Sequence, residues 1–149
     1  MDNFKQIRMS FFALLAGQIF YFLVSFFLVM TNSVVVDKDY DSLIGFMVPI
    51  IVVILVVGSK LLYSRLVNRK IKESSLDEKI FSYRTSNIIK FALLEAANLL
   101  SVTLYLITGD FLYVGMFIIV TALYLMNIPD KEKFIVEYEL NREDINKLK

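Results

Sequence analysis

The chain contains no cysteine and no histidine in its 149 residues. These two absences exclude disulfide bonds, thiol nucleophiles and imidazole general bases, and they remove the usual ligands of zinc and haem iron. No complete catalytic or ligand-binding signature is present in their place. We therefore expect a protein that is not an enzyme, that needs no cofactor or metal, and that binds no nucleic acid.

Apolar residues dominate the composition: 57% of the chain is hydrophobic, and the mean hydropathy is +0.62. A soluble domain of this size needs a mostly polar surface, so the composition is typical of a membrane protein. Four apolar runs cover residues 9–30, 43–62, 88–108 and 111–128. As helices each would be about 27 Å long or longer, close to the hydrocarbon thickness of a bilayer. The predicted fold is an all-α membrane protein with a four-transmembrane-helix bundle over residues 1–128.

Basic residues are distributed unevenly about the four runs, although the net charge is only +1. Fifteen of the sixteen lysines and arginines lie before the first run, in the region from Lys60 to Lys90 around the second connection, or after the fourth run. The other one, Lys38, lies among Asp37, Asp39 and Asp41. Because basic residues flanking membrane spans stay on the cytoplasmic side, we predict cytoplasmic termini and a cytoplasmic central connection. The predicted location is the bacterial inner (cytoplasmic) membrane, with a multi-pass topology.

Local signals at two connections indicate how the helices meet. Ser75-Leu-Asp-Glu78 has the form of a capping box, which starts a helix well before the third run. We therefore predict that helices 2 and 3 extend into the cytoplasm as a basic hairpin. This hairpin is either a solvated orientation signal or a docking surface for a partner or for anionic lipid headgroups. The short connection Gly109-Asp110 makes the third and fourth helices antiparallel neighbours.

Residues 129–149 form a cytoplasmic amphipathic tail. Pro129 followed by Asp130 is typical of a helix start, and Asn141 can cap a further short helix before the terminus. The acidic residues of the tail complement the basic charge of the hairpin. We expect the tail to pack against the hairpin rather than to form a separate domain.

A short internal repeat relates the first and third runs. The sequence Phe-Ala-Leu-Leu occurs at residues 12–15 and again at residues 91–94. Small residues four positions apart let membrane helices approach closely. Each copy contributes such a pair, and the four residues are Ala13, Gly17, Ala92 and Ala96. We predict that helices 1 and 3 cross at these residues.

Glu95 is the only acidic residue within any of the four runs. The helical rise places it about 10 Å below the cytoplasmic surface. A charged, unpaired carboxylate is costly there, so the side chain is expected to be neutral, paired or open to water. Gln18 in helix 1 and Asn98 in helix 3 are predicted at comparable depth. Because helix 2 is apolar throughout the membrane, the polar centre is expected between helices 1, 3 and 4.

Two interpretations of this centre remain open from the sequence. In the structural one, Gln18 and Asn98 form a hydrogen bond across the bundle. Glu95 then pairs with Lys60 or Lys90, which reach in from the cytoplasmic boundary. In the functional one, Glu95 binds and releases a proton or Na⁺, and Gln18 and Asn98 act as neutral ligands.

Three segments carry a resemblance to a known group: Ala-Leu-Leu-Glu-Ala-Ala around Glu95, the Gly17-Gln18 step, and residues 127–134 with the acidic-Leu ending that follows. They resemble a group of small bacterial four-helix membrane proteins. That group looks like distant relatives of the proteolipid subunits, c or K, of rotary ATPases. In proteolipids a membrane carboxylate binds the transported ion, so the resemblance implies that Glu95 is the matching ion-site residue.

The sequence thus predicts two candidate functions. The first is a non-catalytic structural or accessory subunit that acts through its cytoplasmic hairpin and tail. The alternative is a proton- or Na⁺-translocating, proteolipid-like subunit centred on Glu95. The expected partners are the lipid bilayer and either another membrane protein or further copies of the same chain.

Overall fold

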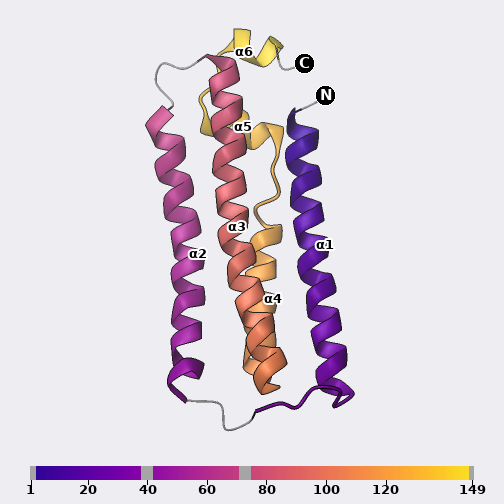
Figure 1. Cartoon of the computed structure of the whole chain (residues 1–149). Coiled ribbons are helices and arrows are strands. Elements are labelled where there is room, and N and C mark those ends of the chain that lie inside the picture. Colours follow the sequence, from indigo (N-terminus) through magenta and orange to yellow (C-terminus); the bar gives the residue numbers. More distant parts are fainter. Residues whose placement is uncertain (1–2, 38–41, 71–74, 148–149) are drawn as a thin grey trace.

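The computed structural model describes residues 3–37, 42–70 and 75–147, and every regular element within these ranges is a helix. Four helices lie side by side (Figure 1): α1 (Asn3–Met30), α2 (Ser42–Lys70), α3 (Leu76–Thr108) and α4 (Phe111–Leu125). Two short helices follow, α5 (Lys131–Glu137) and α6 (Arg142–Lys147). The predicted all-α class is confirmed. Lys38, Asp39 and Asp41 of the predicted outer connection lie outside the described residues.

Three helices, α1, α2 and α3, are long and apolar enough to cross a membrane. The fourth, α4, has 15 residues and ends at Leu125, three residues before the end of the predicted apolar run. At 1.5 Å per residue it is roughly 22 Å long. The helix does not continue to the end of the run because of Pro129. A proline disfavours the α conformation of the residue before it, here Ile128, and its own nitrogen cannot donate a backbone hydrogen bond.

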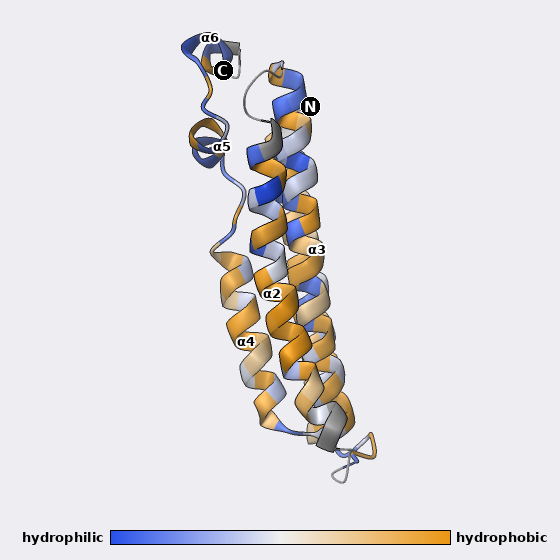
Figure 2. Cartoon of the chain, turned by 90° about the vertical axis from the view of Figure 1, so that its left-hand side faces the viewer, coloured by the Kyte–Doolittle hydropathy of each residue, from blue (hydrophilic) through white to orange (hydrophobic). Residues whose placement is uncertain are grey.

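Helix α3 is the central element, and it packs against α1, α2 and α4. Both ends of the chain lie at the end of the bundle where α2 passes to α3 (Figure 1). Colouring by hydropathy shows apolar residues along α2 and α4 and hydrophilic residues at that same end, where α5 and α6 lie (Figure 2). The start of α1, the end of α2, the start of α3 and the tail therefore lie at the same end of the bundle.

Both predicted turn signals are present in the structure. The hydroxyl of Ser75 accepts a hydrogen bond from the Glu78 amide at 3.4 Å, so α3 begins twelve residues before the third apolar run at Ile88. At the other end, Gly109 adopts φ +69° and donates to the Tyr105 carbonyl at 2.8 Å. A left-handed residue at this position ends the helix and reverses the chain into α4.

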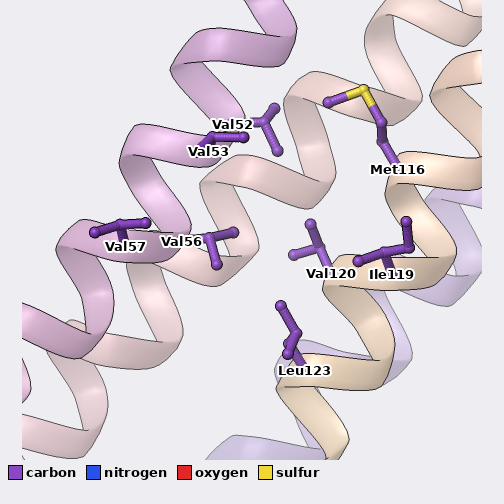
Figure 3. Close-up of a pocket in the computed structure, with 8 residues that line it drawn as sticks. All are labelled: Val52, Val53, Val56, Val57, Met116, Ile119, Val120 and Leu123. Carbon is purple, nitrogen blue, oxygen red and sulfur yellow. The ribbon is translucent and has the colours of Figure 1, made fainter.

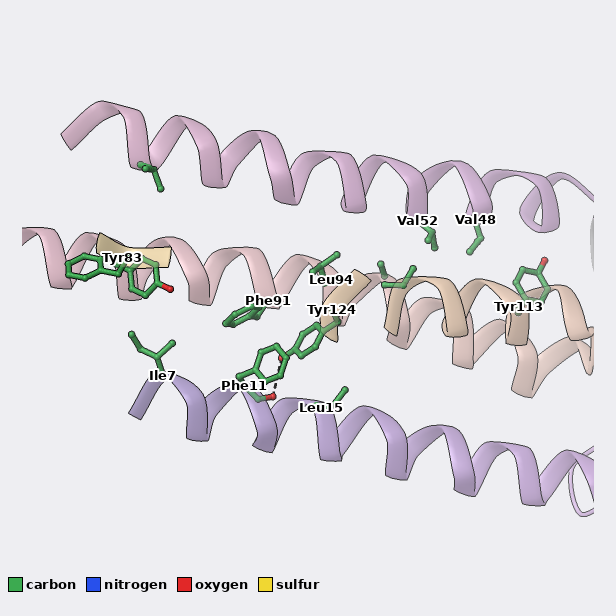
Figure 4. Packing of buried hydrophobic residues seen from close by; sticks show 14 of the residues in the cluster. Ile7, Phe11, Leu15, Val48, Val52, Tyr83, Phe91, Leu94, Tyr113 and Tyr124 are labelled. Carbon is green, nitrogen blue, oxygen red and sulfur yellow. Dashed lines mark hydrogen bonds between the residues drawn. The ribbon is translucent and has the colours of Figure 1, made fainter. Parts of the chain in front are cut away.

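Aromatic residues form the centre of the core. Phe11 of α1, Phe91 of α3 and Tyr124 of α4 are buried, with ring centroids 4.6 to 5.4 Å apart. The Tyr124 hydroxyl donates to the Phe11 carbonyl at 3.2 Å (Figure 4). On the α2 side, Val48 and Val52 are buried, while most of the remaining surface of α2 is exposed. Much of the apolar surface of α2 is therefore not covered by the other helices.

Candidate functional site

The polar centre is a hydrogen-bonded group of three residues, Gln18, Asn98 and Thr121. The Asn98 amide nitrogen donates to Gln18 Oε1 at 2.6 Å and to Thr121 Oγ1 at 3.2 Å. Gln18 and Asn98 are buried, at 1% and 0% exposure. The predicted hydrogen bond between them is present, and the centre lies between α1, α3 and α4 as expected.

The polar centre and its surroundings have more hydrogen-bonding atoms than partners. Four buried side-chain atoms form no hydrogen bond within the described part of the chain: Gln18 Nε2, Ser25 Oγ, Asn98 Oδ1 and Tyr105 Oη. Buried polar groups in proteins are normally paired, and an unpaired one is costly. An amide donor, an amide acceptor and two hydroxyls are thus left without a partner in and near the polar centre.

Glu95 is half-buried and forms neither an ion pair nor a hydrogen bond with any residue that the structure describes. The ammonium group of Lys90 instead lies 3.9 Å from the centre of the Tyr63 ring. Lys60 is exposed on α2. The pairing with Lys60 or Lys90 that the structural interpretation expects is therefore not present among the described residues. Five residues along a helix correspond to a rotation of about 140°, so Lys90 and Glu95 point away from one another.

The four small residues of the internal repeat are not where α1 and α3 meet. Ala13, Gly17 and Ala92 are exposed, and a Cβ atom at Gly17 would meet nothing within 4 Å. Ala96 is half-buried. The face of α1 toward α3 instead carries Phe11 and Gln18. Positions 13 and 17 lie on roughly the opposite side of the helix, which corrects the predicted crossing.

The tail forms a compact unit, which we call the head: residues 130–147, comprising α5, α6 and the segments that join them. Phe134 of α5 and Tyr138, the residue that follows α5, are both 0% exposed. The Phe134 ring lies 5.4 Å from Phe4 of α1, 5.0 Å from Tyr83 of α3 and 5.1 Å from Tyr138, between ring centroids. These four rings form an aromatic cluster that joins α1, α3 and α5.

Polar contacts surround the aromatic cluster. The Tyr83 hydroxyl donates to the Asp130 carbonyl at 3.2 Å, and the hydroxyls of Tyr138 and Ser82 form a hydrogen bond of 3.2 Å. Burial raises the pKa of the Tyr138 phenol above its ordinary value, so its hydroxyl stays neutral at physiological pH. The predicted packing of the tail against the hairpin is thus confirmed, and aromatic burial accounts for more of it than charge does.

Two ion pairs connect the head to the long helices. Lys79 of α3 pairs with Asp144 of α6 at 3.8 Å, and Arg8 of α1 pairs with Asp130 at 3.8 Å. Arg8 also donates to the Pro129 carbonyl at 3.2 Å. The Arg8–Asp130 pair is about half exposed and contributes little to stability, whereas the side chains of Lys79 and Asp144 are only 11% and 15% exposed and join α6 to α3.

Sequence reasoning missed a contact that joins α2, α3 and α5. The Tyr63 hydroxyl donates to the Glu137 carboxylate, while the ring of the same tyrosine lies beneath the ammonium group of Lys90. Lys90 is only 7% exposed. A lysine two residues inside an apolar run was the available signal, because a buried cation requires an aromatic or acidic neighbour.

The described side chains offer hydrogen bonding at the polar centre, one partly exposed carboxylate at Glu95, and an ordered charged surface on the head. Within the described ranges, no group of three or more acidic side chains gathers in a way that could hold a metal ion. No protein-family model, curated protein or solved structure matches this chain.

Proposed function

We propose that the protein is a multi-pass protein of the bacterial inner membrane that acts as a non-catalytic structural or accessory subunit and binds its partner through the head. The observation that carries this proposal is the burial of Phe134 and Tyr138 against α1 and α3. A tail fixed in this way presents a surface of constant shape. A solvated tail that served only as an orientation signal would need no such anchoring.

The outer surface of the head is suited to a protein partner. Val136 of α5 is 76% exposed, although its neighbour Phe134 is fully buried. The head also exposes charged residues of both signs: Glu132, Lys133, Glu139, Arg142 and Glu143. An exposed apolar side chain within a polar rim is typical of a small protein–protein interface.

In this proposal α4 is the fourth span, and both termini and the head are cytoplasmic. In the sequence, every basic residue except Lys38 lies before residue 9, between Lys60 and Lys90, or after residue 128. A span of roughly 22 Å is shorter than the usual hydrocarbon thickness. Local thinning of the bilayer accommodates such a mismatch at modest cost.

The topology is tested with reporter fusions in a bacterial host. A fusion after residue 40 is expected to report the outer side of the membrane, and fusions near residue 75 and at the C-terminus are expected to report the cytoplasm. A cytoplasmic signal after residue 40 would contradict the orientation. A fusion after Gly109 reports separately on α4: an outer-side signal there supports the fourth span.

Partner binding is tested with a photo-crosslinking residue at Val136, in the native membrane. The matched control carries the same residue at Phe46, which is 72% exposed but lies at the far end of α2. We expect a discrete adduct from position 136 that disappears when Phe134→Ala releases the head. Equal adducts from both positions, or an adduct that survives Phe134→Ala, would contradict the proposal.

A second candidate function is a proton or Na⁺ site at Glu95. The observation that favours it is the absence of a cation beside this carboxylate among the described residues, together with the unpartnered amide atoms of Gln18 and Asn98. Asn98 lies three residues after Glu95, so the two side chains project from neighbouring positions on α3. The resemblance to proteolipid subunits implies the same residue.

Labelling with a hydrophobic carbodiimide distinguishes the two functions. Such reagents attack protonated carboxyl groups within the bilayer. An ion site predicts labelling at Glu95 that Na⁺ or high pH suppresses and that Glu95→Gln abolishes, with the fold unchanged. Labelling that is insensitive to both, on a protein of normal stability, would leave only the accessory function.

A further inference from the structure

An apolar cleft runs between α2 and α4 on the outside of the bundle (Figure 3). Each helix contributes four side chains to its walls, and none of the eight is polar: Val52, Val53, Val56, Val57, Met116, Ile119, Val120 and Leu123. The cleft forms because α2 and α4 both pack on α3 rather than closely on each other. Only valines line the α2 wall, and their short side chains leave the space between the two helices unfilled.

The dimensions of the cleft favour a chain over a helix. Its volume is about 200 Å³. A dry cavity of about 150 Å³ in another protein holds one benzene molecule, so 200 Å³ accommodates a short stretch of a single hydrocarbon chain. A transmembrane helix with its side chains is about 10 Å across and cannot enter. Val57 and Ile119 are 49% and 63% exposed, so the cleft is open along one side to the surrounding lipid.

Two lysines lie just beyond the end of the cleft that points toward the head. On α2, Lys60 follows Val56 and Val57 by one helical turn on the same face. On the other wall, the ammonium group of Lys133 lies 3.3 Å from the carbonyl oxygen of Met126, about one turn beyond Leu123. Lys133 therefore lies just past the end of α4, the helix that forms this wall of the cleft.

We propose that this cleft binds one acyl chain of an anionic phospholipid, whose phosphate lies at the end of the cleft beside Lys60 and Lys133. The apolar walls come first along the cleft, and the two lysines follow toward the cytoplasmic surface. This order matches a lipid of the inner leaflet, whose acyl chain is apolar and whose headgroup is anionic. The inference rests on the membrane placement proposed above. It does not depend on the role of the head or of Glu95.

The charge of the headgroup provides the expected selectivity. Each lysine near an anionic membrane surface strengthens binding about fivefold, so the pair gives a preference on the order of thirtyfold. The test is native mass spectrometry of the purified full-length protein with phosphatidylglycerol or phosphatidylcholine of identical acyl chains. We expect a single retained phosphatidylglycerol molecule and roughly thirtyfold weaker retention of phosphatidylcholine.

Two kinds of variant separate the cleft from the bilayer surface in general. Val57→Trp fills the open side of the cleft, and its matched control is Ile54→Trp, at a residue that is 62% exposed on α2 but does not line the cleft. The double variant Lys60→Gln/Lys133→Gln removes the headgroup contacts, and Arg142→Gln on α6 controls for loss of charge. Gel filtration and circular dichroism establish that each variant is folded.

The proposal expects Val57→Trp to abolish the retained lipid, and the lysine double variant to reduce phosphatidylglycerol to the level of phosphatidylcholine, while both controls behave as the parent protein. Equal retention of the two lipids, or equal losses in Val57→Trp and Ile54→Trp, would overturn it. A dimer that Val57→Trp dissociates would show a second copy in the cleft and would also overturn it. Reporter fusions test the membrane placement independently, so a failed lipid site and a failed topology are distinguishable.

Discussion

The two halves of α3 differ in how their polar side chains are satisfied. In the half toward the head, Tyr83 donates to Asp130, Asn87 donates to the Tyr83 carbonyl, and Ser82 pairs with Tyr138. In the other half, Asn98 and Tyr105 are fully buried, yet each has a polar atom without a hydrogen-bond partner among the described residues. In the half toward the head, these polar side chains are hydrogen-bonded. In the other half, two buried side chains keep polar atoms that form no hydrogen bond with the described residues.

This difference follows from the two surroundings that we propose for α3. The head is in water, where burying Phe134 and Tyr138 is strongly favourable. Within the bilayer, lipid is as apolar as the helix surfaces, so close packing and a few hydrogen bonds hold the helices together. We infer that the head is energetically separable from the spans, and that any binding of small polar species concentrates at the polar centre.

The largest expected effect comes from removing the centre of the aromatic cluster. Phe134→Ala should cost about 3–5 kcal/mol, because a fully buried ring is lost and three other rings line the resulting cavity. If the head is separable, the variant releases α5 and α6 while the spans keep their helicity. Limited proteolysis and circular dichroism in detergent measure the two effects.

Val136→Ala is the matched control for this prediction, because Val136 is in the same helix but 76% exposed. It should change neither the cleavage rate nor the helicity. Loss of helicity throughout the bundle in Phe134→Ala would show that head and spans fold as one unit, which contradicts the proposed separation.

The same tyrosine-to-phenylalanine change in both regions sharpens the comparison. Tyr63→Phe removes the hydrogen bond to the Glu137 carboxylate but keeps the ring beneath Lys90, and it should cost about 1.5–3 kcal/mol. Tyr21→Phe removes a neutral hydrogen bond of 3.1 Å to Thr103, and it should cost about 0.6 kcal/mol. Unfolding in mixed micelles measures the loss of stability in each variant. A larger loss for Tyr21→Phe than for Tyr63→Phe would contradict the conclusion that hydrogen bonds near the head contribute more than those within the spans.

Features that depend on short stretches of sequence could be predicted. Apolar runs indicate the long helices because length and composition alone decide whether a segment spans a bilayer. The Ser75 cap and the Gly109 turn are also local, since each involves residues within four positions of one another. The polar centre could be predicted because few polar residues occur within the runs, and polar side chains within a membrane pair with one another.

Contacts between distant residues of similar type could not be predicted. Large and small apolar residues occur on both sides of α1, and lipid accepts either kind, so hydrophobicity does not identify the packed face. Phe11 packs into the aromatic core, so the face of α1 that carries Phe11 is buried and Gly17 is exposed. The contact among Tyr63, Lys90 and Glu137 depends on how α5 returns to the bundle, which no local pattern specifies.

A smaller effect is expected in the polar centre. Asn98→Ala removes the hydrogen bonds to Gln18 and Thr121, and it should cost about 0.6–1.7 kcal/mol, the range for such bonds within membranes. Thr121→Val removes only the bond of 3.2 Å and should cost less. The double variant Gln18→Leu/Asn98→Leu should be more stable than the sum of its single changes predicts, because neither residue is then buried without its partner. Additive effects would show that the pair is not coupled.

The smallest effect is expected at Gly17, where the sequence alone predicted a close crossing of helices. A side chain at position 17 meets nothing within 4 Å, so Gly17→Leu should introduce no clash. It should even gain a few tenths of a kcal/mol, because leucine favours the helical conformation more than glycine does. The contrasting variant is Ala97→Leu, at a residue with 0% exposure in α3, where overpacking should cost about 1–3 kcal/mol. Thermal unfolding of both variants in detergent tests this expectation.

A strongly destabilised Gly17→Leu protein would mean that this face of α1 contacts another helix, either in the same chain or in a second copy. Gel filtration separates those cases, because only a contact between copies lowers the apparent mass when it is lost.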